Sequence, residues 1–124
     1  AVLVSGLLGG TATEVIKQWR AGASVLIVST KIMAEYEAVL SRPKFKLPEW
    51  VVQELLGYVR EHAEWVTPDR EIREIARDPS DNKFLEAAVS GQAKWLVSGD
   101  NDLLDLGEFE GILVIPPWEF LRLL

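Results

Sequence analysis

Short apolar runs separated by amphipathic helical stretches constrain the fold of this chain more than any other feature. The runs are 24–28 (Ser-Val-Leu-Ile-Val), 93–97 (Ala-Lys-Trp-Leu-Val) and 112–115 (Ile-Leu-Val-Ile). Runs of this length without polar alternation are typical of strands buried on both faces, as in parallel sheets covered by helices. The alternation therefore predicts an α/β fold with three α/β/α layers and a mostly parallel central sheet.

Helix start and stop signals divide the rest of the chain. Thr11 and Glu14 form a capping-box pattern, which predicts a helix that reaches Trp19. Further helices are expected from Thr30 to Arg42-Pro43, over about 48–64, from Asp81 to Gly91, directly after Asp102 and from Pro117 onward. A short strand at Trp65-Val66 and a polar connection over 67–80 complete the expected order.

Length and composition set broad limits. The 124 residues are expected to form one domain, 1–124. No apolar run approaches the roughly 18 residues that a membrane-spanning helix needs. The absence of cysteine excludes disulfides and thiolate zinc sites and fits a cytoplasmic protein. A net charge of −6 argues mildly against a nucleic-acid binder, although bound cations would offset part of that charge.

Four acidic residues fall where a strand gives way to a helix or on the inward edge of a helix. They are Glu35, Asp81, Asp100 and Asp102. In open parallel sheets ligands collect beyond the carboxyl ends of the strands, and Asp100 and Asp102 directly follow the run 93–97. We expect no Lys or Arg among the four acids. Because carboxylates gathered in this way repel one another, the pattern predicts a bound metal ion.

Each acid also has a simpler interpretation. Glu35 lies at the edge of the apolar stripe of its helix and can equally be a surface glutamate paired with Lys31. Ser80 or Asp81 can cap the helix that follows, and Asp100 can cap the short helix after it. These alternatives stay open for the single residues, and only the joint placement of the acids favours a metal site.

The other reactive residue types indicate no competing chemistry. His62 is the only histidine and lies among charged residues, so we expect it to face solvent rather than to serve a zinc site or a Ser-His-Asp triad. The five tryptophans are expected mostly in the core. The basic stretch 42–46 is either a phosphate-contacting loop or a solvated turn.

Five blocks of sequence carry a family resemblance. They are 2–8 (Val-Leu-Val-Ser-Gly-Leu-Leu), 32–36 together with 40–45, 77–85 (Arg-Asp-Pro-Ser-Asp-Asn-Lys-Phe-Leu), 96–104 (Leu-Val-Ser-Gly-Asp-Asn-Asp-Leu-Leu) and 117–121 (Pro-Trp-Glu-Phe-Leu). In this order and spacing they resemble PIN-domain proteins, in particular the toxin components of toxin–antitoxin pairs. The resemblance covers nearly the whole chain and implies a PIN-like fold of ribonuclease-H-like architecture.

The resemblance implies roles for individual residues. Glu35, Asp81 and Asp100 match the second, third and fourth acidic positions of the family. Asp102 matches a further acid beside the fourth, and Ser98 matches the hydroxyl residue that commonly precedes this pair. The implied activity is a Mg²⁺- or Mn²⁺-dependent endoribonuclease in which the four acids are the catalytic metal ligands and Ser98 is auxiliary. The implied partners are an RNA substrate, an antitoxin protein and a second copy of the chain in a homodimer.

The first block departs from the family pattern. The family begins with a strand that ends in Asp-Thr-Asn, lies in the middle of the sheet and supplies the first metal ligand. Ala1 aligns with that Asn, so we expect the first strand and its aspartate upstream of Ala1, with Val2 to Leu8 forming the following helix. A sheet without its central strand would leave backbone groups unpaired at roughly 1–3 kcal/mol each. The missing aspartate favours the alternative of a catalytically silent PIN-like module for protein interaction or dimerisation.

Overall fold

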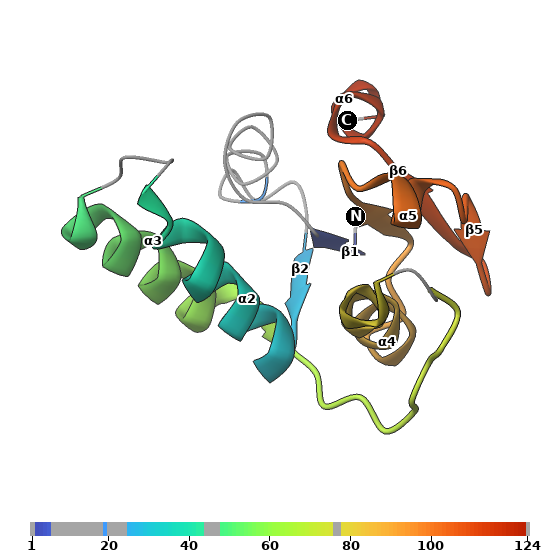
Figure 1. Ribbon diagram of the computed structural model, residues 1–124, viewed down its shortest axis with the longest axis horizontal. Helices are drawn as coiled ribbons and strands as arrows, with labels where there is room; N and C mark the ends of the chain where they lie inside the picture. The colour runs from blue at the N-terminus through green and yellow to red at the C-terminus, as the bar shows by residue number, and fades with distance from the viewer. Residues whose placement is uncertain (1, 6–18, 20–24, 44–47, 76–77, 124) are drawn as a thin grey trace.

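Helices and strands alternate along the chain, which confirms the predicted α/β class (Figure 1). The computed structural model describes residues 2–5, 19, 25–43, 48–75 and 78–123. The strands are β1 (Val2–Ser5), β2 (Val25–Val28), β3 (Glu64–Trp65), β4 (Trp95–Val97), β5 (Glu108–Phe109) and β6 (Ile112–Ile115). The helices are α2 (Thr30–Leu40), α3 (Glu49–His62), α4 (Asn82–Ser90), α5 (Asn101–Leu104) and α6 (Pro117–Arg122), with a 3₁₀ turn η2 (Pro79–Asp81) before α4.

The strands join in one six-stranded sheet in the order β3-β2-β1-β4-β6-β5. Every neighbouring pair is parallel except β5 with β6. Helix α4 packs against β1 and β4, and α2 packs against both α3 and α4. Figure 1 shows α4 and α6 on opposite sides of the strands β4 and β6. Since the parallel strands point the same way, the segments that follow β2 and β4 leave the same edge of the sheet.

The start of the chain differs from the expectation. Val2–Ser5 is strand β1 and not part of a helix, and it pairs with β2 on one side and β4 on the other. Its Val-Leu-Val sequence has a high strand propensity, and a strand in this place gives the backbone groups of both neighbours their hydrogen-bond partners. Positions 6–8 of the predicted helix lie outside the described residues. A further strand and aspartate upstream of Ala1 stay a prediction.

Smaller differences concern the shortest elements. Strand β3 begins one residue earlier than expected, and the N–H of Val66 continues its pairing by donating to the carbonyl of Val28 at 2.9 Å. Strand β5 was not predicted, because two residues are too few to give a pattern. Of the helix predicted from Thr11, only Trp19 lies within the described residues, and there it is helical and buried.

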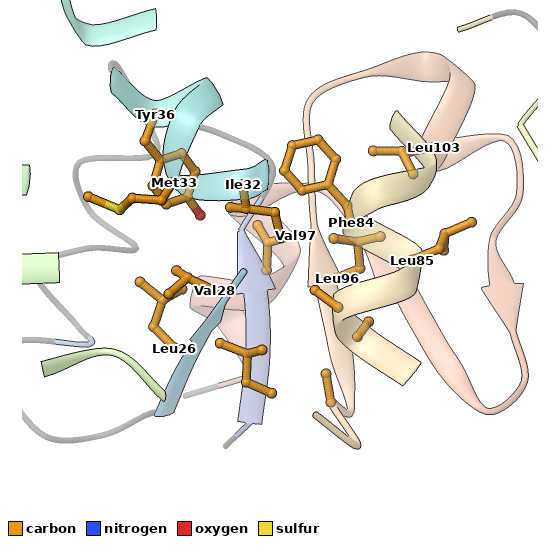
Figure 2. Packing of buried hydrophobic residues seen from close by; sticks show 14 of the residues in the cluster. Leu26, Val28, Ile32, Met33, Tyr36, Phe84, Leu85, Leu96, Val97 and Leu103 are labelled. Atoms are coloured by element: carbon orange, nitrogen blue, oxygen red, sulfur yellow. The ribbon is translucent and has the colours of Figure 1, made fainter. Parts of the chain in front are cut away.

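The core forms where α2 and α4 meet the sheet (Figure 2). Buried side chains come from β2 and β4 of the sheet and from one face of each helix: Leu26, Ile27, Val28, Leu96 and Val97, with Ile32, Met33 and Tyr36 of α2 and Phe84, Leu85 and Ala88 of α4. Full burial of such aliphatic or aromatic side chains stabilises the fold by about 1.5–3 kcal/mol each. The apolar faces therefore fix how α2 and α4 are rotated, and with that where their polar residues point.

The tryptophan prediction is wrong for most of these residues. Trp19 is buried, but Trp50, Trp65 and Trp118 are 68%, 44% and 57% exposed. Trp50 and Trp118 lie near the starts of α3 and α6. The first turn of a helix carries few neighbours on its outer side, so an apolar residue there escapes the core even when its spacing suits it.

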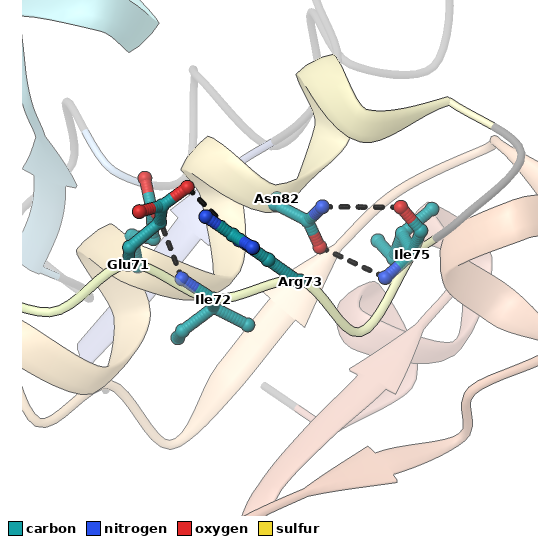
Figure 3. A network of polar contacts seen from close by, with 6 residues as sticks. Glu71, Ile72, Arg73, Ile75 and Asn82 are labelled. Carbon is teal, nitrogen blue, oxygen red and sulfur yellow. Dashed lines mark hydrogen bonds and ion pairs between the residues drawn. The ribbon is translucent and has the colours of Figure 1, made fainter.

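Two side chains of α4 fasten the connection that follows β3 (Figure 3). The Asn82 amide is buried, accepts from the N–H of Ile75 at 2.9 Å and donates to the carbonyl of the same residue at 3.1 Å. A carboxylate oxygen of Glu86 accepts from the N–H of Ile72 at 3.0 Å. Asn82 thus satisfies both backbone hydrogen-bonding groups of Ile75, as a neighbouring strand would do. The connection is held against α4 by side chains rather than by strand pairing.

The substitution Asn82→Ala removes both bonds to Ile75. We expect it to lower the free energy of unfolding by about 1–3 kcal/mol for each backbone group left buried and unpaired. Urea denaturation followed by circular dichroism measures the change. Gln53→Ala is the control, because the exposed Gln53 amide donates to Glu49 one turn away on α3 and its loss should cost well under 1 kcal/mol. Equal losses in the two variants would contradict the role given to Asn82.

Candidate metal centre

Three of the four predicted acids come together beyond the carboxyl end of β4. Asp100 and Asp102 follow that strand, and Asp81 closes η2 at the point where α4 begins. One carboxylate oxygen from each residue lies within 4.8 Å of the others. The packing of α4 against β1 and β4 brings Asp81 to this edge of the sheet. We call these residues the three-carboxylate group.

Asp81 is the most enclosed member of the three-carboxylate group. It is 7% exposed, and its Oδ2 atom is buried without a hydrogen-bond partner. Leaving such an oxygen unpaired is costly, because it has lost its water and gained nothing in exchange. A cation shared with Asp100 and Asp102 would supply what this atom lacks. The buried oxygen is therefore the feature that distinguishes this site from an ordinary acidic surface.

The donor set suits a hard divalent cation. All three side chains offer carboxylate oxygens, which are the ligands that Mg²⁺ and Mn²⁺ prefer. Because one oxygen from each side chain lies within 4.8 Å of the others, the three residues could hold one ion together. The residues present therefore fit a divalent ion.

Burial and neighbouring charges alter the protonation of Asp81. Burial raises the pKa of Asp81 to about 7, assisted by proton sharing with Asp100 and by the charges of Asp100, Asp78 and Glu35. Without a bound cation, the Asp81 side chain is thus mostly protonated and uncharged below about pH 7. A bound divalent ion would lower the pKa of Asp81, since it requires the ionised carboxylate.

Local hydrogen bonds orient Asp100. The Ser98 side chain is buried, and its hydroxyl oxygen accepts from the N–H of Asp100 at 3.0 Å. The Oδ1 atom of Asp100 accepts from the N–H of Asp102 at 2.9 Å at the start of α5. Asp100 is therefore a helix cap, as the simpler interpretation held. Because a carboxylate has lone pairs on both oxygens, capping leaves room for a cation.

The capping interpretation does not hold for Asp81. This residue stands at the N-cap position of α4, but its side chain makes no capping hydrogen bond. The cap of the preceding turn η2 is Asp78, whose Oδ1 accepts from the N–H of Ser80 at 3.1 Å and from its hydroxyl at 2.5 Å. The Asp81 carboxylate makes no capping bond and lies instead with those of Asp100 and Asp102.

Glu35 lies beside the three-carboxylate group but not within it. Its Oε1 atom is 2.6 Å from the Nζ atom of Lys83, with the two side chains 30% and 14% exposed. The expectation that no cation lies among the four acids is therefore wrong, and the partner of Glu35 is Lys83 rather than Lys31. Glu35 still acts on the site, since its charge contributes to the raised pKa of Asp81. A role for Glu35 as a metal ligand stays a prediction.

Lys83 and Asn82 are the residues that sequence reasoning missed. Both directly follow Asp81 in Asp-Asn-Lys, at the start of a helix whose apolar stripe begins only at Phe84. Polar residues ahead of that stripe and next to a candidate ligand were a usable signal for involvement at the site. Their partners were not readable, because Glu35 and Ile75 come close only through the packing of α2 and of the connection against α4.

Two remaining expectations concern His62 and the membrane. His62 is exposed as predicted and stacks on Tyr58 with ring centroids 4.1 Å apart. Within the described parts of the chain, no helix is long and apolar enough to span a bilayer.

Comparison with known proteins decides the family. A family model described as PIN domain matches residues 1–102, which include the three-carboxylate group, Glu35 and Ser98. The chain belongs to the PIN-domain family. No curated protein and no solved structure matches it significantly. PIN domains are generally nucleases that use divalent metal ions, and this supports a nuclease-type function for the acidic edge of the sheet.

The raised pKa of Asp81 predicts how the stability of the metal-free protein depends on pH. Because the folded pKa of about 7 lies above the unfolded value near 3.9, the folded state binds more protons, and this contribution is full below about pH 4. It is lost as the pH rises through 7. Asp81→Asn stays neutral, so its free energy of unfolding should rise relative to the unsubstituted protein between pH 4 and pH 8.

Urea denaturation in EDTA across this pH range measures the difference. Asp105→Asn is the matched control, since Asp105 is an exposed acid three residues after Asp102 and outside the three-carboxylate group. A difference between Asp81→Asn and the unsubstituted protein that does not vary with pH would show that Asp81 titrates normally.

Proposed function

We propose that this PIN-domain protein is a divalent-metal-dependent endoribonuclease that hydrolyses phosphodiester bonds of RNA with Mg²⁺ or Mn²⁺. The observation that carries the proposal is the three-carboxylate group, with oxygens within 4.8 Å of one another and a buried, unpartnered Oδ2 on Asp81. A cluster of carboxylates by itself would repel a phosphodiester. It becomes a phosphate-binding site only with a cation in place.

Each residue of the site has a definite part in this proposal. Asp81, Asp100 and Asp102 hold the cation, and Ser98 fixes the backbone from which the Asp100 carboxylate extends. When bound, a divalent ion lowers the pKa of an attacking water and stabilises the departing oxygen. Glu35 is proposed as a further ligand, directly or through water.

Lys83 adds a fixed positive charge at the border of the site. Its ammonium group is held by Glu35 and is mostly enclosed, so it keeps its place without a ligand. A positive charge there favours the approach of a phosphate and partly offsets the repulsion from the acids. No side chain of the site needs to act as a covalent nucleophile.

The family resemblance extends the proposal beyond the reaction. The protein is proposed to be the toxin of a toxin–antitoxin pair, to act in the cytoplasm as a homodimer, and to be held in check by an antitoxin protein. Its architecture is proposed to be the three-layer, ribonuclease-H-like arrangement of PIN domains. The family match supports the PIN-type fold and the nuclease class, whereas the toxin role, the homodimer, the antitoxin and the cytoplasmic location are proposed from the resemblance alone.

One observation favours a second candidate. Glu35 is engaged by Lys83 and not by the three-carboxylate group, so fewer acids than expected face a shared ion. A PIN-like module that binds a partner or dimerises without cutting RNA would have this arrangement without any need for a metal. Metal binding separates the two candidates.

Cleavage of RNA tests the proposed activity. The protein should cut single-stranded RNA with Mn²⁺ or Mg²⁺, and Asp100→Asn should reduce the rate by about 100-fold or more, since changes outside the ligand shell already cost 10–100-fold. Asp105→Asn should cleave at the unsubstituted rate. Gel analysis of a labelled RNA measures all three. Cleavage that persists both in EDTA and in Asp100→Asn would have to come from another site or from a contaminant.

Thermal unfolding tests metal binding without any substrate. An ion that binds the folded state stabilises it by about 2.7 kcal/mol at a concentration 100-fold above its Kd. The melting temperature of the unsubstituted protein should therefore rise with Mn²⁺ at constant ionic strength, and the rise should vanish in Asp81→Asn. Identical melting curves with and without Mn²⁺ would support the silent module instead.

A further inference from the structure

A groove of about 900 Å³ lies between α2 and the stretches 71–75 and 79–83. Ser80 and Asn82, which flank Asp81 in the chain, both line it. Glu35 and its partner Lys83 line it as well, and the charge of Glu35 reaches Asp81. The groove therefore borders the candidate metal centre, although none of the three carboxylates is among its lining residues.

The α2 wall of the groove has small side chains in the middle and basic side chains at both ends. Ala34 and Glu35 lie three and four positions after Lys31, and Ala38 lies four after Ala34, so these residues share one side of α2. Arg42 extends this wall just beyond the end of the helix. The methyl groups of Ala34 and Ala38 leave the centre hollow, while Lys31 and Arg42 stand at the ends. Lys31 lies in the first turn of α2 and Arg42 lies two positions past its last residue, so the two cations stand at opposite ends of this wall.

The opposite wall is held in place by the bonds of Figure 3. Ile72 and Ile75 line it, and they are fastened by Glu86 and by Asn82. Because both anchors belong to α4, which packs on the sheet, the wall does not depend on a ligand for its position. The groove is a preformed feature of the fold.

The charges along the groove are not balanced. Each carboxylate that lines it already accepts a bond: Glu35 from Lys83, Glu71 from Arg73, and Glu86 from the N–H of Ile72. Lys31 and Arg42 are both exposed, and neither has a carboxylate partner among the described residues. Glu86 keeps its negative charge because its donor is a neutral N–H, so the four cations of the lining exceed its three carboxylates by one. On a protein with a net charge of −6, a groove with an excess of positive charge is a place suited to an anionic chain.

We propose that this groove binds the sugar–phosphate backbone of a single RNA strand, with Lys31 and Arg42 contacting phosphates beside the one at the three-carboxylate group. The inference rests on the proposed nuclease function and deepens it by naming the path of the substrate. Contacts to phosphates position a strand but carry no base information, so binding here is strongly salt-dependent and tolerant of sequence.

The wider basic stretch is only partly involved. Arg42 is its first residue and lines the groove, which favours the phosphate-contacting interpretation over a solvated turn for this position. Residues 44–46 of the stretch lie outside the described residues.

Fluorescence anisotropy with a labelled 12-residue oligouridylate in EDTA tests the groove without cleavage. We expect Lys31→Gln and Arg42→Gln each to weaken binding about 3- to 10-fold in low salt. Each should also reduce the slope of log Kd against log salt by about 0.7, the value for one phosphate contact on a single strand. Lys94→Gln is the matched control: Lys94 is exposed at the opposite end of β4, and its loss should leave binding unchanged. Thermal melts establish that all variants are folded.

The outcomes separate the groove from the nuclease. Binding by Lys31→Gln and Arg42→Gln equal to that of the unsubstituted protein overturns the groove, even if RNA is cleaved with Mn²⁺. Weakened binding in both variants supports the groove, even if no cleavage occurs and the nuclease proposal fails. Displacement of the RNA by polyglutamate at equal charge concentration would identify an acidic protein segment as the occupant and overturn the proposal.

Discussion

The packing of α4 against the centre of the sheet is the constraint on which the rest of this structure depends. Phe84, Leu85 and Ala88 are buried beside Leu96 and Val97 of β4, and this contact fixes both the height and the rotation of the helix. The position of α4 in turn determines where the functional residues near its start lie. The residues just before the apolar stripe must stand at the carboxyl end of β4, where Asp100 and Asp102 leave the strand. Core packing and the candidate metal centre are therefore two consequences of one contact.

That placement is electrostatically unfavourable, and the molecule manages it in two ways. The negative charge at Asp81 is reduced by protonation, as its raised pKa indicates. The negative charge of Glu35 is offset by the ion pair with Lys83. The two solutions differ in reversibility. A proton leaves when a divalent cation arrives, whereas Lys83 is a permanent part of α4 and stays beside Glu35 of α2. Such a site gives up stability in the metal-free state and regains it on binding, as is common where function requires like charges to meet.

The sequence predicted the parts of this arrangement that are encoded locally. The apolar runs located β2, β4 and β6, and the apolar stripes located α2 and α4, because burial of these residues is what forms the elements. Asp100 as a cap was also within reach, since capping depends on the next two residues alone. The pairing of Glu35 with Lys83 and the clamp of Asn82 on Ile75 were not, because each joins segments that meet only after folding. The family alignment of Val2–Ser5 predicts a helix, but the local strand propensity of Val-Leu-Val and the two neighbouring strands decide for a strand.

The net charge of −6 and a polyanionic substrate conflict only if charge is averaged over the surface. Interactions between exposed charges fade beyond about 10 Å at moderate salt, so a bound strand responds to the groups within that distance and hardly to the remainder. Within the groove, each carboxylate that lines it is already engaged by a donor, while Lys31 and Arg42 are not. At the three-carboxylate group, a divalent ion would offset most of the negative charge and offer a phosphate a cation to bind. Metal and groove together would give an acidic protein two neighbouring sites for phosphates, and the excess negative charge elsewhere would oppose binding at any other place.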